Sequence, residues 1–121
     1  MFKQEFADVR IEVTAQRIGP DVQVTLAGGD GPHIGSVAIG EPDTLLSAAG
    51  PSATVSVFNA CGHRDGELAA PIAKRLAAAL RCRVVVLAGV HYNSFSNELL
   101  KKTAAFTEEL AESLTAYFQN T

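Results

Sequence analysis

The spacing of apolar residues changes partway along this chain of 121 residues, and that change limits the fold more than any other feature. Early in the chain, apolar and polar residues alternate, which is typical of a β-strand with one wet face. The apolar members are Val9, Ile11, Val13 and Ala15. Later, apolar residues recur at every fourth position, as on one face of an α-helix. These are Leu68, Ile72, Leu76 and Leu80. Strands followed by helices predict an α/β fold, a two-layer sandwich of one sheet and its helices.

The sequence predicts about five strands, at residues 6–18, 22–26, 33–39, 53–59 and 83–90. Gly19, Pro20 and Asp21 supply turn chemistry, so we expect the first two strands to form an antiparallel hairpin. The strand at 53–59 carries apolar residues on both faces, which favours a covered, central position. Residues 40–52 are expected to form a loop with one helical turn, because they are rich in Pro, Gly, Ser and Ala.

Two helices are predicted after the fourth strand. The first carries the four-residue spacing described above, and Asp65 is its candidate N-cap. Pro71 lies inside it, so this helix either begins later or is kinked in its first turn. The second begins at Ser94 or Ser96 and carries the apolar stripe Leu99, Thr103, Phe106, Leu110, Leu114 and Tyr117. The predicted order is therefore β-β-β-β-α-β-α, with a mostly antiparallel sheet.

Composition excludes several classes of function. The formal charge is −3 and no run of Lys or Arg reaches three residues, so the basic patch of a nucleic-acid-binding protein is missing. The longest apolar run, residues 84–90, is far shorter than the roughly 20 residues that cross a bilayer. The residues after Met1 lack the apolar centre of a secretory signal. We expect a single domain over residues 1–121, in the cytoplasm and without membrane contact.

The long final helix suggests a partner. Its stripe covers the sheet, whereas Phe118 and the exposed strand edges are left to another surface. Small sheets with one covered face often pair with a copy of themselves. The sequence therefore predicts a homodimer, and the alternative is a monomer with short or charged edges.

The three histidines lie at junctions marked by glycine. His33 precedes Gly35, His63 follows Gly62, and His91 follows Gly89 at a distance of two. The last two histidines follow strands, at the edge of the sheet where α/β proteins bind ligands. If the strand at 33–39 is antiparallel to its neighbours, His33 lies at the same edge. Three converging imidazoles would suit an open zinc site, and the alternative is that each histidine caps backbone groups at a strand end.

Anion binding is a second hypothesis. The segment Gly62, His63, Arg64, Asp65 leads into the first predicted helix. The N–H groups and dipole at a helix N-terminus favour a phosphate or carboxylate, and an arginine adds a bidentate contact. The glycines at 28–31 are equally well explained by a simple hairpin turn, because neither the Walker nor the dinucleotide spacing is present.

Cysteine chemistry is not expected. Cys61 and Cys82 show no metal-ligand spacing, and both are predicted to be buried thiols. Cys61 lies two residues before His63, which places the two side chains on opposite sides of an extended chain. A nucleophilic thiolate requires a positioned base, so the sequence predicts that Cys61 is inert.

Three short segments resemble one known family. They are residues 33–38, reading HIGSVA, residues 62–65, reading GHRD, and residues 89–92, reading GVHY. They are similar to the prenylated-flavin chaperone family, the small D-type subunits that accompany gallate-type decarboxylases. The resemblance extends over about residues 9–114, nearly the whole domain. The family is allied in fold to bacterial proteins that resemble proteasome assembly chaperone four.

The resemblance implies a non-enzymatic accessory protein that binds prenylated FMN or FMN, or a decarboxylase client. It implies a cofactor-binding surface formed by His33, Gly35, Gly62, His63, Arg64, His91 and Tyr92. Apolar groups near Phe58 would meet the flavin ring. Two alternatives stay open. One is a small metal-dependent enzyme that uses the three histidines, and the other is an interaction module without a ligand.

Overall fold

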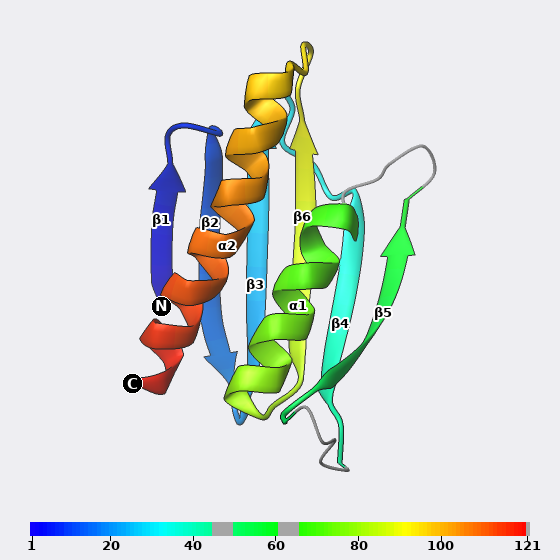
Figure 1. Cartoon of the computed structure of the whole chain (residues 1–121), viewed down its shortest axis with the longest axis vertical. Helices are drawn as coiled ribbons and strands as arrows, with labels where there is room; N and C mark the ends of the chain where they lie inside the picture. The colour runs from blue at the N-terminus through cyan, green and yellow to red at the C-terminus, as the bar shows by residue number, and fades with distance from the viewer. Residues whose placement is uncertain (45–49, 61–65, 121) are drawn as a thin grey trace.

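The computed structural model describes residues 1–44, 50–60 and 66–120 and contains one sheet and two helices (Figure 1). The strands are β1 (Phe2–Phe6), β2 (Ile11–Ile18), β3 (Asp21–Gly29), β4 (Ser36–Pro42), β5 (Ala53–Asn59) and β6 (Val84–His91). The helices are α1 (Gly66–Leu80) and α2 (Asn97–Gln119). The predicted α/β class is therefore confirmed.

The six strands lie in the order β1-β2-β3-β6-β4-β5. Neighbouring strands are antiparallel except β3 and β6, which are parallel. The predicted hairpin is confirmed, because β2 and β3 pair antiparallel from Ile11 opposite Gly28 to Ile18 opposite Asp21. Two expectations are wrong. β1 was not predicted as a separate strand. The glycines at 28–31 follow β3 and were explained as a hairpin turn, but β6 lies between β3 and β4, so these glycines do not connect neighbouring strands.

The position of β5 also differs from the expectation. It was predicted to be a covered central strand, but it is an edge strand of the sheet. Six of its seven residues are exposed or half-buried, and only Ala53 is buried. Of its larger apolar residues, Val55 is half-buried, whereas Val57 and Phe58 are exposed. At its start, Asp43 accepts hydrogen bonds from the hydroxyls of Ser52 (2.5 Å) and Thr54 (2.7 Å), which lower the pKa of that carboxyl.

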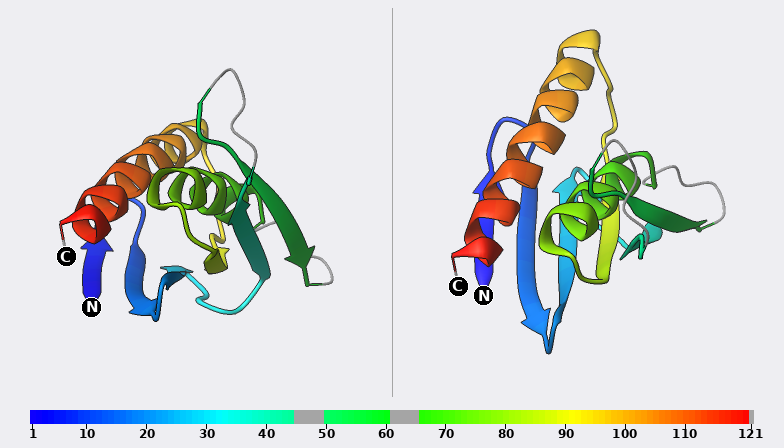
Figure 2. Two further views of the ribbon diagram at one scale, coloured as in Figure 1. Left: turned by 90° about the horizontal axis from the view of Figure 1, so that it is seen from below. Right: turned by 60° about the horizontal axis from the view of Figure 1, so that its bottom comes forward.

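Both helices cover the same face of the sheet, and the opposite face, called here the open face, carries no helix (Figure 2). Alternation along the strands places the buried residues under the helices; they include Ile11, Val13, Val24, Leu26, Val84 and Val86. α1 lies very close to β4, because a Cβ on Gly40 would lie only 2.5 Å from the carbonyl oxygen of Ala73. A glycine is therefore required there for the helix to pack on the sheet.

The predicted helices are confirmed, with details that differ. α1 continues through Pro71, which is exposed, and its predicted cap, Asp65, lies outside the described residues. The N-cap of α2 is Ser96, whose Oγ accepts the N–H of Leu99 at 3.1 Å. The predicted α2 stripe is buried at Thr103, Phe106, Leu110 and Leu114.

Phe118 is buried within this chain and needs no partner to cover it. It is only 2% exposed, and the guanidinium of Arg17 lies 5.4 Å from the centre of its ring. The argument for a dimer therefore rests on the strand edges alone. Cys82 is a buried free thiol, as predicted, and burial raises its pKa. Cys61 lies outside the described residues, and so does most of the predicted helical turn within 40–52. Neither helix described by the structure is long and apolar enough to span a membrane.

Candidate ligand-binding rim

One edge of the sheet collects the segments that the sequence singled out. Ser36, at the start of β4, lies opposite both Asn59 at the end of β5 and Ala88 near the end of β6. Gly29, at the end of β3, lies opposite His91. Strands β3, β5 and β6 therefore end where β4 begins, at the top of the sheet in Figure 1. We call this edge the rim; its described residues are 7–10, 28–36, 59–60 and 88–93.

His33 and His91 both lie beside Gly31. The Nδ1 atom of His33 lies 2.8 Å from the carbonyl oxygen of Gly31. A Cβ on Gly31 would lie 3.7 Å from Cβ of His91, which is ordinary contact. The expectation that His33 and His91 share an edge is thus met, because β4 is antiparallel to both β5 and β6. His63, the third histidine, lies outside the described residues, so its approach to the other two stays a prediction.

His33 itself is not in a strand. It was expected to begin one, but β4 begins at Ser36, and the chain at His33 passes over Gly89 of β6. A Cβ on Gly89 would overlap the backbone carbonyl of His33, so only glycine leaves room for this crossing. The His33 N–H donates to the Gly89 carbonyl at 3.4 Å, and the Gly35 N–H donates to Ala88 at 2.9 Å. The carbonyl of Gly35 accepts from the N–H of Ala60 at 2.8 Å, so this segment joins the ends of β5 and β6.

Arg10 and Asp30 form an ion pair at the β1–β2 side of the rim, which was not predicted from the sequence. Nη1 of Arg10, in the β1–β2 turn, donates to Oδ1 of Asp30 at 2.8 Å. Oδ2 of Asp30 accepts the backbone N–H of Asn93 at 2.9 Å. The hydrogen bond from Arg10, with the further bond from Asn93, holds the pKa of Asp30 below its ordinary value. Asp30 therefore connects the ends of β3 and β6 to the β1–β2 turn.

Tyr92 contributes to the same connection. Its hydroxyl donates to the carbonyl of Val9 at 2.5 Å, and the Arg10 guanidinium lies 5.5 Å from its ring centre. Burial raises the pKa of this phenol. Tyr92 was predicted to contact a ligand, and the structure places it at the rim with its hydroxyl bonded within the protein.

We expect the Asp30 contacts to give the protein a characteristic response to acid. A carboxyl whose pKa is lowered by folding stabilises the native state above its ordinary pKa, 3.8, and loses that contribution as pH falls through the folded value. Asp30→Asn should therefore unfold at a lower temperature than the wild type at about pH 7. The difference should shrink as the pH falls from 3.8 through the lower folded value, because the carboxyl of the unfolded chain is protonated first and the native carboxyl only below its lowered pKa.

Thermal unfolding of both proteins across this pH range measures the effect. Glu112→Gln, an exposed carboxyl on α2, is the control and should follow the wild type. A melting-temperature difference for Asp30→Asn that does not change with pH would contradict the assignment.

The α1 end of the rim contains a buried hydroxyl, that of Ser36, with no partner in the described part of the chain. The side chain of Asn59 accepts the N–H of Gly66, the first residue of α1, at 3.1 Å. Ser36 lies opposite Asn59 in the sheet and is 1% exposed, yet its Oγ has no hydrogen-bond partner among the residues that the structure describes. Such a group costs free energy unless something bonds to it. Gly62, His63 and Arg64, the predicted anion contacts, fall outside the described residues.

Metal binding finds no support among the residues that the structure describes. No three side chains of the His, Cys, Asp and Glu types lie close enough there to share an ion. The three-histidine hypothesis depends on His63, whose position is not described. It therefore stays a prediction.

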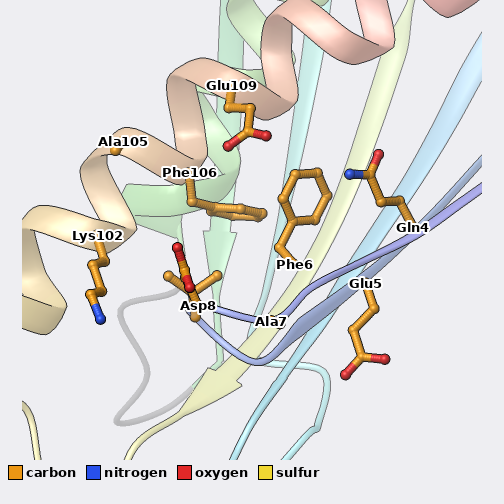
Figure 3. Close-up of a pocket in the computed structure, with 10 residues that line it drawn as sticks. Gln4, Glu5, Phe6, Ala7, Asp8, Lys102, Ala105, Phe106 and Glu109 are labelled. Carbon is orange, nitrogen blue, oxygen red and sulfur yellow. The ribbon is translucent and has the colours of Figure 1, made fainter.

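A cavity of about 350 Å³ lies away from the histidines, between the β1–β2 turn and α2 (Figure 3). The rings of Phe6 and Phe106 pack edge to face there, with centres 5.0 Å apart. The charged lining residues are Glu5, Asp8, Glu109 and Lys102. Three carboxylates against one ammonium group disfavour a phosphate, so this cavity does not suit FMN.

The open face next to the rim is apolar. Leu87 of β6, Val37 of β4 and Phe58 of β5 lie opposite one another across the three strands. Val85 and Ile39 form the next pair toward the other end of the sheet. Phe58 is 69% exposed and Ile39 is 40% exposed. We call these five residues the apolar patch. It adjoins the rim, and such an exposed patch is typical of a binding surface.

The fold and the rim together define a class of protein. It is a small α/β domain in which hydrogen bonds and an ion pair connect polar groups at one edge of the sheet, beside an exposed apolar patch. The sequence matches the family described as the prenylated flavin chaperone LpdD-like domain over residues 5–119, so the chain belongs to this family. It is also 28% identical to Protein LpdD of Lactiplantibacillus plantarum over 120 residues, which are 98% of this chain and 84% of that protein. The family is one of prenylated-flavin chaperones, and the expectation of an accessory protein of this family is confirmed at that level.

Proposed function

We propose that this protein binds prenylated FMN, or FMN, at the rim and presents it to a decarboxylase client. The observation that supports this function best is that His33 and His91 both lie beside Gly31, next to the apolar patch. The flavin ring and its prenyl addition would lie against Leu87, Val37 and Phe58. The imidazoles would hydrogen-bond to the polar edge of the ring.

The phosphate would lie at the α1 end of the rim. Helix N-termini bind phosphates through free N–H groups and the helix dipole. The Oγ of Ser36, which has no partner among the described residues, would supply a further donor at this end. The segment with Gly62, His63 and Arg64 leads directly into α1, and Arg64 would form a charge-assisted contact with the phosphate. The residues present therefore fit a phosphate-bearing flavin.

A chaperone role follows from the openness of this surface. The rim and the apolar patch lie on the outside of the domain, so a flavin bound there would keep part of its ring accessible to a second protein. An enzyme that uses a flavin usually encloses it, because closing the site excludes water. An exposed surface suits transfer of the cofactor to a client.

Thermal shift with flavin ligands tests the proposal. FMN and prenylated FMN should raise the melting temperature, and a ligand at 100 times its Kd adds about 2.7 kcal/mol to stability. Riboflavin, which lacks the phosphate, should have a much smaller effect. His91→Ala should weaken FMN binding by roughly fivefold, since one hydrogen bond is worth about 1 kcal/mol. The matched control is Gln16→Ala, an exposed polar residue toward the opposite end of β2.

Each remaining outcome assigns a different function. Equal shifts with riboflavin and FMN would contradict the phosphate contact. Stoichiometric zinc that is lost in His63→Ala would favour the metal-dependent alternative. No response to flavin or metal, together with binding of a decarboxylase, would leave an interaction module.

A further inference from the structure

We propose that the cavity between the β1–β2 turn and α2 receives the side chain of an arginine or lysine residue from a protein that binds at the rim. The inference rests on the proposed function in one respect, because it names the chemistry by which a client would bind there. It does not depend on flavin binding. It starts from the lining of the cavity, which is shown in Figure 3.

The cavity has an apolar base and an acidic entrance. Phe6 and Phe106 are 8% and 3% exposed, so their rings form the base. Asp8 in the β1–β2 turn and Glu109 on α2 are both exposed, and their carboxylates point toward these rings (Figure 3). Glu5, the third acidic residue of the lining, points to the other side of β1. Arginine and lysine have an apolar stem and a cationic end, so either side chain matches both parts of the cavity.

No cation of this chain neutralises the two carboxylates. In the part of the chain that the structure describes, no ion pair or hydrogen bond engages the side chain of Asp8 or Glu109. Lys102 also lines the cavity, but its Nζ lies 3.4 Å from Oε1 of Glu98, one turn earlier in α2. Its ammonium group points away from the rings (Figure 3). The entrance therefore keeps a negative charge that a basic partner would complement.

A bare metal ion does not fit this arrangement. No three His, Cys, Asp or Glu side chains among the described residues lie close enough to share an ion. The carboxylates of Asp8 and Glu109 instead flank two aromatic rings, and aromatic rings attract organic cations. A guanidinium or ammonium group on an alkyl stem therefore suits the cavity better than a divalent metal.

The size and position of the cavity favour a protein side chain. Its volume of about 350 Å³ is at the lower end of pockets for small molecules, which measure about 300–1,000 Å³. One wall is the β1–β2 turn, and the same turn belongs to the rim. The carbonyl of Val9 accepts the hydroxyl of Tyr92, and Arg10 pairs with Asp30. A protein that covers the rim would therefore reach the entrance of the cavity, and arginine is enriched among the residues that dominate interfaces.

Titration of the ¹⁵N-labelled protein with two blocked amino acids tests the role of charge. N-acetyl-arginine amide should shift the amide resonances of Asp8 and Ala105, with a dissociation constant of about 1 mM for a ligand of this size. N-acetyl-citrulline amide has the same length but a neutral urea group. It should bind at least about tenfold more weakly, because the charge-assisted contact is lost. Equal affinities of the two compounds would overturn the proposal.

Two matched pairs of variants test the walls of the cavity. Glu109→Gln should weaken binding of the arginine compound by about threefold, as expected for an exposed ion pair. Glu112→Gln removes an exposed carboxyl outside the lining and should have no effect. Ala105→Leu fills the cavity without changing its charge and should abolish binding, whereas Ala104→Leu, outside the lining, should not. All four side chains are exposed on α2, so each variant should fold. Equal effects within either pair would overturn the proposal.

Binding of a decarboxylase separates this inference from flavin binding. Ala105→Leu should weaken binding of the decarboxylase and leave the thermal shift with FMN unchanged. A wild type with no FMN shift would contradict the flavin proposal alone, because the arginine titration needs no flavin. A decarboxylase that binds Ala105→Leu as tightly as the wild type would overturn the assignment to a protein side chain. So would tighter binding, by about tenfold, of agmatine, a free guanidinium compound with an alkyl stem.

Discussion

Phe106→Ala should lower the free energy of unfolding by about 3–5 kcal/mol. Phe106 is 3% exposed and lies where α2 meets the sheet. Its ring packs against Phe6 edge to face, with centres 5.0 Å apart and planes at 79°. Removing the ring costs its transfer from water, the aromatic contact and the cavity that remains. Domains of this size have a free energy of unfolding of about 5–15 kcal/mol, so this single substitution removes a large share of the stability.

Chemical denaturation followed by circular dichroism measures this loss. The control is Leu100→Ala on the same helix, where the side chain is 56% exposed and the expected change is within about 0.5 kcal/mol. The cavity between β1 and α2 would grow in Phe106→Ala, and flavin binding should be unchanged if the flavin binds at the rim. A loss of FMN binding in a folded Phe106→Ala protein would place the ligand in that cavity.

The local elements were predictable because each depends on nearby residues. Alternation alone gave β2 and β3, since a strand with one buried face must alternate. The four-residue spacing of Ile72 and Leu76 predicted α1, and both residues are fully buried on the side of that helix that faces the sheet. β1 was missed because its three central residues are all polar and exposed, so only its two phenylalanines carry a signal.

The order of the strands was not predictable in the same way. Inserting β6 between β3 and β4 pairs Val24 with Val86, which are 62 positions apart in the chain. Nothing near either residue specifies that contact, which results from α1 crossing over one face of the sheet. β5 was placed wrongly for a different reason. Apolar residues on both faces favoured a central strand, but among the described residues β5 pairs with β4 alone, and the sequence of a strand does not show whether it has one neighbour or two.

The candidate site was partly visible in the sequence. The histidines stood out because each lies near a glycine, and the structure gives one of those glycines a steric role, at Gly89 under His33. The ion pair between Arg10 and Asp30 was not visible, because it joins two turns whose proximity depends on the pairing of β2 with β3. Polar contacts between distant turns require the sheet register before they can be predicted.

Gly89→Ala should lower the free energy of unfolding by about 2–4 kcal/mol and disrupt the rim. The new Cβ would occupy the position of the His33 carbonyl. Backbone atoms cannot rotate away as a flexible side chain does, so the segment at His33 must lift from β6. The hydrogen bonds from His33 to Gly89 and from Gly35 to Ala88 would be lost with it. His33 would then leave its place beside His91, and FMN binding at the rim should fall together with stability.

Gly31→Ala separates the effect of this crossing from that of losing any glycine. Its Cβ would lie 3.7 Å from Cβ of His91, an ordinary contact. Its stability should therefore equal that of the wild type or exceed it slightly, because alanine restricts the unfolded chain. Hydrogen exchange at the Ala60 amide, which donates to Gly35, reports on the segment directly and should speed up in Gly89→Ala alone. Equal exchange and equal FMN affinity in the two variants would mean that the crossing of His33 over Gly89 does not hold the rim together.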